Sequence, residues 1–203
     1  MIEPHWASDG SDRAVADHLA ARIRSGARLI GVPGGRTPAA IFDLLAREDL
    51  PWEHLRLVLV DDRMVPADHP ASNFALLARA FADRPVRIEP LAEGPWNAGP
   101  LDLVWLGMGA DGHIASIFPG CGPDPALPPA VVRTLPDPLP PEAPFERLTM
   151  TLALLASAAE IILVIRGRDK RQVLEDALAG RNRLPVAQLL EAAKSRVTIF
   201  WAE

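Results

Sequence analysis

Short apolar runs alternate with amphipathic segments along most of the chain. The runs are five or six residues long and rich in Val, Ile and Leu, which is typical of strands buried on both faces of a sheet. They predict strands at 28–32, 55–60, 101–106, 161–165 and 197–201, with weaker signals at 86–88 and 147–151. Apolar residues at helical spacing predict helices at 9–24, 39–48, 71–82, 152–159, 171–180 and 184–193.

This alternation of buried strands and helices indicates a parallel sheet with helices on both faces. We therefore expect an α/β fold, with residues 1–203 forming a single domain around one doubly wound, mostly parallel, Rossmann-like sheet. The length fits one large domain, and the sequence contains no internal repeat. Residues 119–144 contain ten prolines and predict a long ordered loop without a helix or central strand.

The composition and net charge limit the classes of molecule that the protein is expected to bind. The net charge is −5, which argues against a nucleic-acid or anionic-membrane partner but leaves an anionic small molecule open. Cys121 is the only cysteine, so the chain cannot form an intrachain disulfide. This is compatible with a reducing compartment. The N-terminus has no secretory signal pattern, and no apolar run is long enough to span a membrane. We expect a cytoplasmic protein that is a monomer or a small homo-oligomer.

A glycine turn joins the first predicted strand to the helix after it. Gly34 and Gly35 are followed by Arg36, Thr37 and Pro38, and Thr37 is predicted to cap a helix whose first residue is Pro38. Free N–H groups and the positive end of the helix dipole make such a turn a suitable phosphate site, to which Arg36 and Thr37 add donors. A tight turn with a cap and no ligand explains the local pattern equally well.

The segment 101–120, LDLVWLGMGADGHIASIFPG, is the most informative part of the chain. Its glycines match the G-x-G-x-x-G pattern of dinucleotide-binding proteins. We reject that interpretation because Pro119 stops the helix that should follow, and because the next 25 residues are the proline-rich segment rather than a helix and second strand. No cofactor is therefore expected.

His113 lies just beyond the end of this strand, where open α/β sheets bind their ligands. A histidine at such a place is suited to act as a general base near neutral pH, although a loop histidine bonded to a carbonyl is the simpler alternative. No metal site is expected, because the other histidines are scattered and no cysteine pair lies nearby. Ser116 lacks the glycine elbow of a hydrolase nucleophile.

Charged residues follow two further strands. Asp61, Asp62 and Arg63 come after the strand at 55–60, and Lys170 opens the helix after 161–165. Each position alone is more typical of a solvated turn or surface residue. Together they place charges at the carboxyl edge of the sheet, near His113 and the glycine turn.

Taken together and in this order, these segments resemble the 6-phosphogluconolactonase family, within the glucosamine-6-phosphate isomerase/deaminase-like superfamily. The resemblance runs from about residue 30 to about 180. It is carried by 34–38 (GGRTP), 61–66 (DDRMVP), 69–73 (HPASN), 106–120 (LGMGADGHIASIFPG), 147–151 (RLTMT) and 167–170 (GRDK).

The sequence departs from the family pattern at three places. Arg36 replaces the usual Ser, Asp62 replaces the usual Glu, and Ile114 replaces the Thr common in lactonases. The deaminase branch also reads Asp-Gly-His-Ile-Ala, but it continues with Phe-Asn-Glu-Pro and has Asp-Glu-Tyr in its earlier block. Here Phe118-Pro119 and Arg63 stand at those places, and the chain contains no tyrosine. The lactonase branch is therefore favoured.

The resemblance implies hydrolysis of 6-phospho-D-glucono-1,5-lactone to 6-phosphogluconate in the pentose phosphate pathway. His113 is expected to be the general base, oriented by Asp111. The expected substrate-binding and phosphate-binding residues are Gly34, Gly35, Arg36, Thr37, Asp61, Arg63, Arg147 and Lys170; whether Arg63 serves the phosphate or the oxyanion stays open. A sugar-phosphate isomerase/deaminase and a non-catalytic sugar-phosphate sensor are the alternatives.

Overall fold

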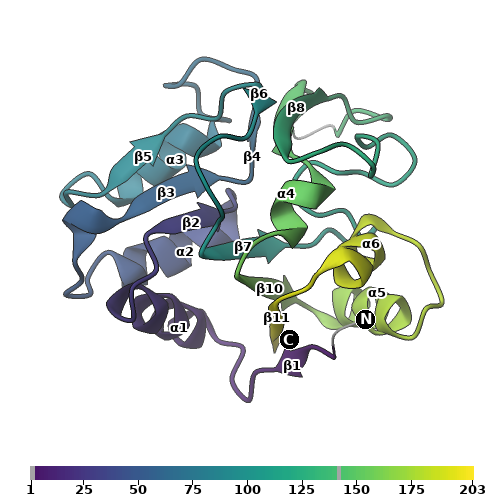
Figure 1. Ribbon diagram of the computed structural model, residues 1–203, viewed down its shortest axis with the longest axis horizontal. Helices are drawn as coiled ribbons and strands as arrows, with labels where there is room; N and C mark the ends of the chain where they lie inside the picture. Colours follow the sequence, from purple (N-terminus) through teal and green to yellow (C-terminus); the bar gives the residue numbers. More distant parts are fainter. Residues whose placement is uncertain (1–2, 141–142) are drawn as a thin grey trace.

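The core of the protein is a seven-stranded sheet in which all strands run parallel, in the order β1-β11-β10-β7-β2-β3-β5. The computed structural model describes residues 3–140 and 143–203. Figure 1 shows the sheet running through the molecule. Its strands are β1 (His5–Trp6), β2 (Leu29–Val32), β3 (Arg56–Leu59), β5 (Arg87–Glu89), β7 (Leu103–Gly107), β10 (Glu160–Arg166) and β11 (Arg196–Ala202). The predicted parallel α/β sheet is confirmed.

Helices cover both faces of this sheet (Figure 1). On one face lie α1 (Asp12–Arg24), α2 (Arg36–Leu45) and α3 (Asn73–Ala80); on the other lie α4 (Leu152–Ala156), α5 (Arg168–Leu178) and α6 (Pro185–Ala192). A 3-10 turn, Trp52–His54, precedes β3. Successive residues of β7 alternate between the two cores: Trp105 packs with α2, and Leu106 packs with the α4–α6 side. Among the described residues, no helix is long and apolar enough to cross a membrane.

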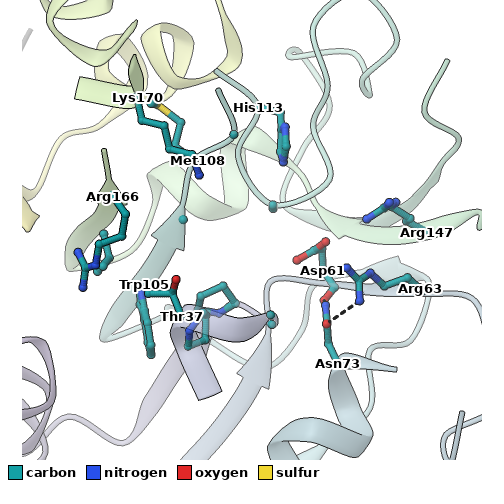
Figure 2. Close-up of a pocket in the computed structure, with 18 residues that line it drawn as sticks. Thr37, Asp61, Arg63, Asn73, Trp105, Met108, His113, Arg147, Arg166 and Lys170 are labelled. Carbon is teal, nitrogen blue, oxygen red and sulfur yellow. Dashed lines mark hydrogen bonds between the residues drawn. The ribbon is translucent and has the colours of Figure 1, made fainter. Parts of the chain in front are cut away.

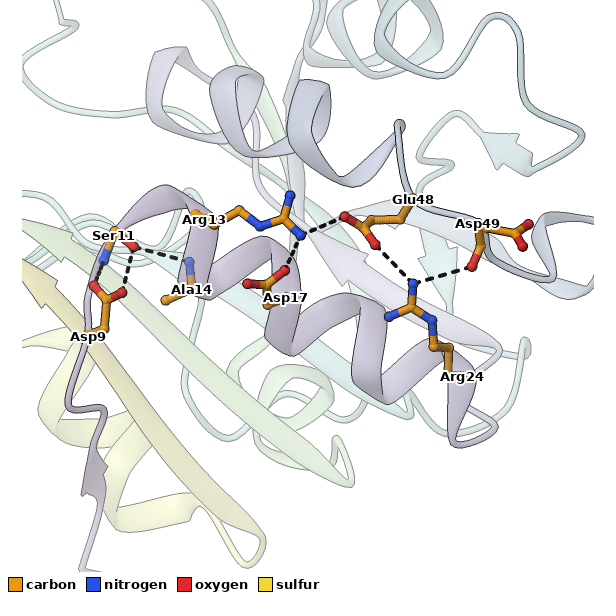
Figure 3. Close-up of polar contacts among 8 residues, drawn as sticks. All are labelled: Asp9, Ser11, Arg13, Ala14, Asp17, Arg24, Glu48 and Asp49. Atoms are coloured by element: carbon orange, nitrogen blue, oxygen red, sulfur yellow. Dashed lines mark hydrogen bonds and ion pairs between the residues drawn. The ribbon is translucent and has the colours of Figure 1, made fainter.

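The helix after β2 begins earlier than predicted. Ser11, Ser72 and Thr151 cap α1, α3 and α4 through their hydroxyls. Figure 3 shows the first of these caps, in which the Ser11 hydroxyl accepts the N–H of Ala14. By contrast, α2 starts at Arg36 with Gly35 as its cap, and no side chain caps it. Gly35 has a φ of 109°, which turns the chain into the helix at once. The predicted Thr37 cap is therefore wrong, because Thr37 and Pro38 lie in the first turn of α2. Pro38 is tolerated there because N–H groups of the first turn have no partner within the helix.

A second, four-stranded antiparallel sheet lies beside the first, in the order β4-β9-β8-β6. Its strands are β4 (Asp61–Arg63), β6 (Gly94–Pro95), β8 (Ala130–Thr134) and β9 (Arg147–Met150). The expectation that 119–144 holds no central strand is wrong, because β8 occupies a proline-free stretch and pairs on both sides. In this sheet Arg63 and Arg147 are directly opposite one another.

The winding of the main sheet reverses between β2 and β7. From β2 the chain proceeds outward to β3 and β5, and from β7 it proceeds the other way to β10 and β11. Carboxyl ends of strands at such a reversal leave a crevice between the loops that follow them. The glycine turn after β2 and the His113 loop after β7 both lie there.

Candidate active site

A cavity of about 340 Å³ occupies this crevice (Figure 2). It collects residues from the ends of β2, β7 and β10, from β4 and β9 of the second sheet, and from the starts of α2, α3 and α5. Eight of the predicted site residues line it: Gly34, Gly35, Thr37, Asp61, Arg63, His113, Arg147 and Lys170. The side chain of Arg36 lies outside the described part of the structure. Asp111 does not line the cavity, but it contacts His113, which does.

The candidate base is held by the residue two positions before it. His113 Nδ1 lies 2.7 Å from Asp111 Oδ1, which also accepts the backbone N–H of His113 at 3.2 Å. Because a carboxylate only accepts hydrogen bonds, this contact puts the imidazole proton on Nδ1 and leaves the lone pair on Nε2. Figure 2 shows the imidazole extending into the cavity.

Gly109 makes this arrangement possible. A Cβ at this position would lie 2.2 Å from His113 Nδ1 and 2.4 Å from Asp111 Oδ1. The backbone N–H of Gly109 donates to the carbonyl of His113 at 2.9 Å, which closes the loop. A glycine is therefore required at this position because His113 and Asp111 pack closely against it, and not because the loop binds a dinucleotide.

Arg63 is fixed by the segment that leads into α3. Its Nη1 donates to the carbonyl of Ala71 at 3.0 Å. It also donates to Asn73 Oδ1 at 3.1 Å (Figure 2). Asn73 Nδ2 in turn donates to the Asp61 carbonyl at 3.2 Å, and a Cβ on Gly34 would lie 2.0 Å from the Asn73 amide. Asn73 thus joins the glycine turn to Arg63. In the sequence Asn73 belongs to the 69–73 segment of the family resemblance but has no predicted role, so this contact was missed.

Asp62, by contrast, has a structural role. Its Oδ1 accepts the N–H of Asn73 at 2.7 Å and that of Arg63 at 2.8 Å, and its Oδ2 accepts the N–H of Phe74 at 3.0 Å. A carboxylate at the N-terminus of α3 satisfies free N–H groups and complements the helix dipole. The side chain is absent from the cavity wall.

Asp61 is buried at the cavity wall, close to Arg63 and Arg147. Its Oδ2 accepts a hydrogen bond of 2.6 Å from the buried Ser116 hydroxyl. Burial raises the pKa of Asp61, while that hydrogen bond and the charges of Arg63 and Arg147 act in the opposite direction. Among the described residues that line the cavity, Asp61 is the only acidic one.

Arg147 is 6% exposed, an unusual degree of burial for a cation. Its Nη2 donates to the Ala143 carbonyl at 3.1 Å, and burial, reinforced by the charge of Arg63, lowers its pKa from the ordinary value. The Nε atoms of Arg63 and Arg147 are buried without a hydrogen-bond partner among the described residues. Such donors favour an anionic ligand.

The opposite side of the cavity carries Lys170 and Arg166 (Figure 2). Burial lowers the pKa of Lys170, and the charge of Asp111 partly opposes that shift. Arg166 was not predicted, although it directly follows the apolar run 161–165; its Nη2 donates to Asp12 Oδ1 at 2.6 Å. Among the described residues, four basic side chains line this cavity in a chain of net charge −5: Arg63, Arg147, Arg166 and Lys170. Within 3–140 and 143–203, no cluster of three or more His, Cys, Asp or Glu could hold a metal ion.

Comparison with known proteins identifies the family. The family described as "Glucosamine-6-phosphate isomerases/6-phosphogluconolactonase" matches residues 7–94 and 88–201. The chain is 38% identical to a 6-phosphogluconolactonase of Mesorhizobium japonicum, over 93% of this chain and 87% of that protein.

Solved structures agree with the sequence match. The fold resembles a 6-phosphogluconolactonase of Shewanella baltica with a TM-score of 0.82, 26% identity, and coverage of 99% of this chain and 98% of that one. It also resembles a monomeric glucosamine-6-phosphate deaminase (TM-score 0.78, 18% identity, coverage of 100% and 98%), so the fold alone does not separate the two activities. With nearly its whole length matched, the chain belongs to the glucosamine-6-phosphate isomerase/6-phosphogluconolactonase family.

Proposed function

We propose that this cavity hydrolyses 6-phospho-D-glucono-1,5-lactone to 6-phosphogluconate, the lactonase step of the pentose phosphate pathway. The observation that carries the mechanism is the His113–Asp111 pair, whose free Nε2 faces a cavity lined by basic side chains. A lactone is an activated ester, so a positioned water and a general base suffice for its hydrolysis. In this proposal His113 supplies the base, and the polar wall of the cavity holds the water.

His113 is the proposed base. Nε2 accepts a proton from the water as its oxygen attacks the lactone carbonyl, and the imidazolium is stabilised by the Asp111 carboxylate. The tetrahedral intermediate then collapses, breaking the bond to the ring oxygen. The proton on Nε2 passes to that oxygen, which becomes the hydroxyl of the opened chain. The imidazole is thereby returned to its starting state.

Two sets of basic groups bind the two ends of the substrate in this proposal. The glycine turn and the N-terminus of α2, together with Lys170 and Arg36, hold the phosphate. Arg63 and Arg147 lie together on the other side of the cavity beside Asp61, and we assign Arg63 to the oxyanion that develops on the lactone carbonyl. The structural support is the fixed guanidinium of Arg63, which needs no reorganisation to donate.

The direct test is a rapid lactonase assay on freshly generated lactone, corrected for spontaneous hydrolysis. Enzyme-dependent formation of 6-phosphogluconate is expected. Release of ammonia from glucosamine 6-phosphate, with no lactonase activity, would assign the chain to the deaminase reaction. Tight binding of 6-phosphogluconate with no turnover of either substrate would make it a sensor.

We further propose that the enzyme acts in the cytoplasm as a monomer or small homo-oligomer. The support for the compartment is the single cysteine, which needs no oxidising environment for folding. Cell fractionation and light scattering on the purified protein test the two statements separately.

A further inference from the structure

Phe118 touches two of the groups assigned to the reaction. Its ring centroid lies 4.7 Å from that of His113, with an angle of 39° between the rings. The guanidinium carbon of Arg147 lies 5.4 Å from the same centroid. One side chain therefore contacts both the proposed base and a buried cation of the cavity.

A tight turn brings Phe118 back to His113. Ile114 and Ile117 form an isolated antiparallel bridge, and Ala115 between them has a φ of 47°, in the left-handed region that residues other than glycine rarely adopt. Ile114 and Ile117 are both buried in the core. The turn is thus anchored, and it places the Phe118 ring against the imidazole five residues earlier.

The base needs a second support besides Asp111. The side chain of His113 is 32% exposed and that of Asp111 is 53% exposed, so their hydrogen bond is open to water and restrains the ring at one atom only. A neighbouring aromatic ring restrains the imidazole over its face. The Arg147 cation is attracted by the π-face of the same ring, which helps to fix a guanidinium whose Nε has no partner among the described residues.

We propose that Phe118 is a positioning residue for lactone hydrolysis, which orients the His113 imidazole for proton transfer and holds Arg147 at the cavity wall. The proposal rests on the assignment of His113 as the base. Phe118 also lines an open lobe of about 640 Å³ that adjoins the first cavity and shares Arg63, His113 and Arg147 with it. Loss of the ring would let both side chains move into that space.

The test is a double-mutant cycle with His113. Phe118→Leu should lower kcat about threefold to tenfold, the effect expected for one lost aromatic contact, whereas Phe118→Tyr should stay within about twofold of the parent. In the His113→Ala background, Phe118→Leu should cause a smaller loss of kcat than in the parent, because only the contact with Arg147 remains to be lost. Phe145→Leu, the same change in the same lobe beside His69, should leave kcat unchanged. Phe118→Met, which keeps the volume without a ring, replaces the leucine variant if that variant fails to fold.

A spectroscopic readout tests whether the Phe118–His113 contact exists in solution. The imidazole carbon-bound proton resonances of His113 should shift in Phe118→Leu, because they lose the ring current, and should not shift in Phe145→Leu. Parental kcat in Phe118→Leu, or an equal loss in both backgrounds, would overturn the proposal. Parental turnover in His113→Ala alone would instead refute the base assignment, and the coupling with it.

Discussion

His113 Nδ1 and Asp111 Oδ1 lie 2.7 Å apart on a loop whose tight packing depends on a glycine, so the tautomer of the base is set by its own sequence neighbour. Asp111→Asn removes the charge and lets an amide face Nδ1. The imidazole then loses its preference for the Nδ1–H tautomer, and kcat should fall about 10- to 100-fold with KM little changed. Steady-state kinetics test this prediction. A rise in KM at constant kcat would show that Asp111 serves substrate binding instead.

Gly109→Ala should impair the same step by a different route. The added Cβ would overlap His113 Nδ1, and the imidazole must move to relieve the clash. We predict a fall in kcat of at least about 10-fold, since a displacement of about 1 Å from the productive geometry is costly. Binding of 6-phosphogluconate, measured by calorimetry, should be nearly retained. Unaltered kcat in a folded Gly109→Ala variant would contradict the geometry of the loop.

Lys170→Ala should mainly weaken phosphate binding, because the side chain contributes charge rather than proton transfer. An increase of about 10-fold or more in KM and in the Kd for 6-phosphogluconate is expected, with a smaller change in kcat. Lys194→Ala removes the charge of an exposed lysine and is the matched control. Parental affinity in Lys170→Ala would show that the phosphate lies elsewhere, for example at Arg63 and Arg147.

The affinity should also depend on alkaline pH through Lys170. Burial lowers the pKa of this ammonium, so it loses its proton at a lower pH than an exposed lysine. The affinity for 6-phosphogluconate should therefore weaken as the pH rises through this lowered pKa. The alkaline decline should vanish in Lys170→Ala; its persistence there would assign it to another group.

Stability at acid pH should depend on Glu160, at the end of β10 opposite the cavity. This carboxylate is 3% exposed and contacts His18 Nε2 at 2.9 Å and Arg22 Nε at 2.6 Å. Burial alone would raise the pKa of Glu160, but the hydrogen bond from His18 and the nearby positive charges lower it below its ordinary value of 4.5. A lowered pKa gives stability that is present above the unfolded-state pKa and is lost as the pH falls through the folded-state pKa.

Glu160→Gln therefore separates the charge from the packing. The variant should lose on the order of 1–3 kcal/mol of unfolding free energy at pH 7 and should show a weaker decline below about pH 4.5 than the parent. Denaturant unfolding at several pH values measures both. Equal acid sensitivity of parent and variant would remove Glu160 from this account. Lactonase activity at pH 7 should be unaffected, because the residue lies outside the cavity.

The main sheet could be predicted from sequence because its central strands are buried on both faces and read as apolar runs. In the second sheet only β9 had a strand signal, because β4 and β6 are three and two residues long and β8 is surrounded by prolines. The same limit applies to the cavity. His113 and the glycine turn have local signals, whereas Asn73 enters the site through tertiary packing on Gly34. Arg166 has a local signal as well, because it directly follows the apolar run 161–165.

The central claim is that His113 is the base for lactone hydrolysis, and single-turnover kinetics of His113→Ala test it most directly. Mixing excess enzyme with fresh lactone at pH 7 measures the chemical step, with the surface variant His54→Ala as the control. The account predicts a rate lower by about 10²–10⁴-fold in His113→Ala, with 6-phosphogluconate bound nearly as tightly as by the parent, and a parental rate in His54→Ala. A parental rate in His113→Ala would contradict it.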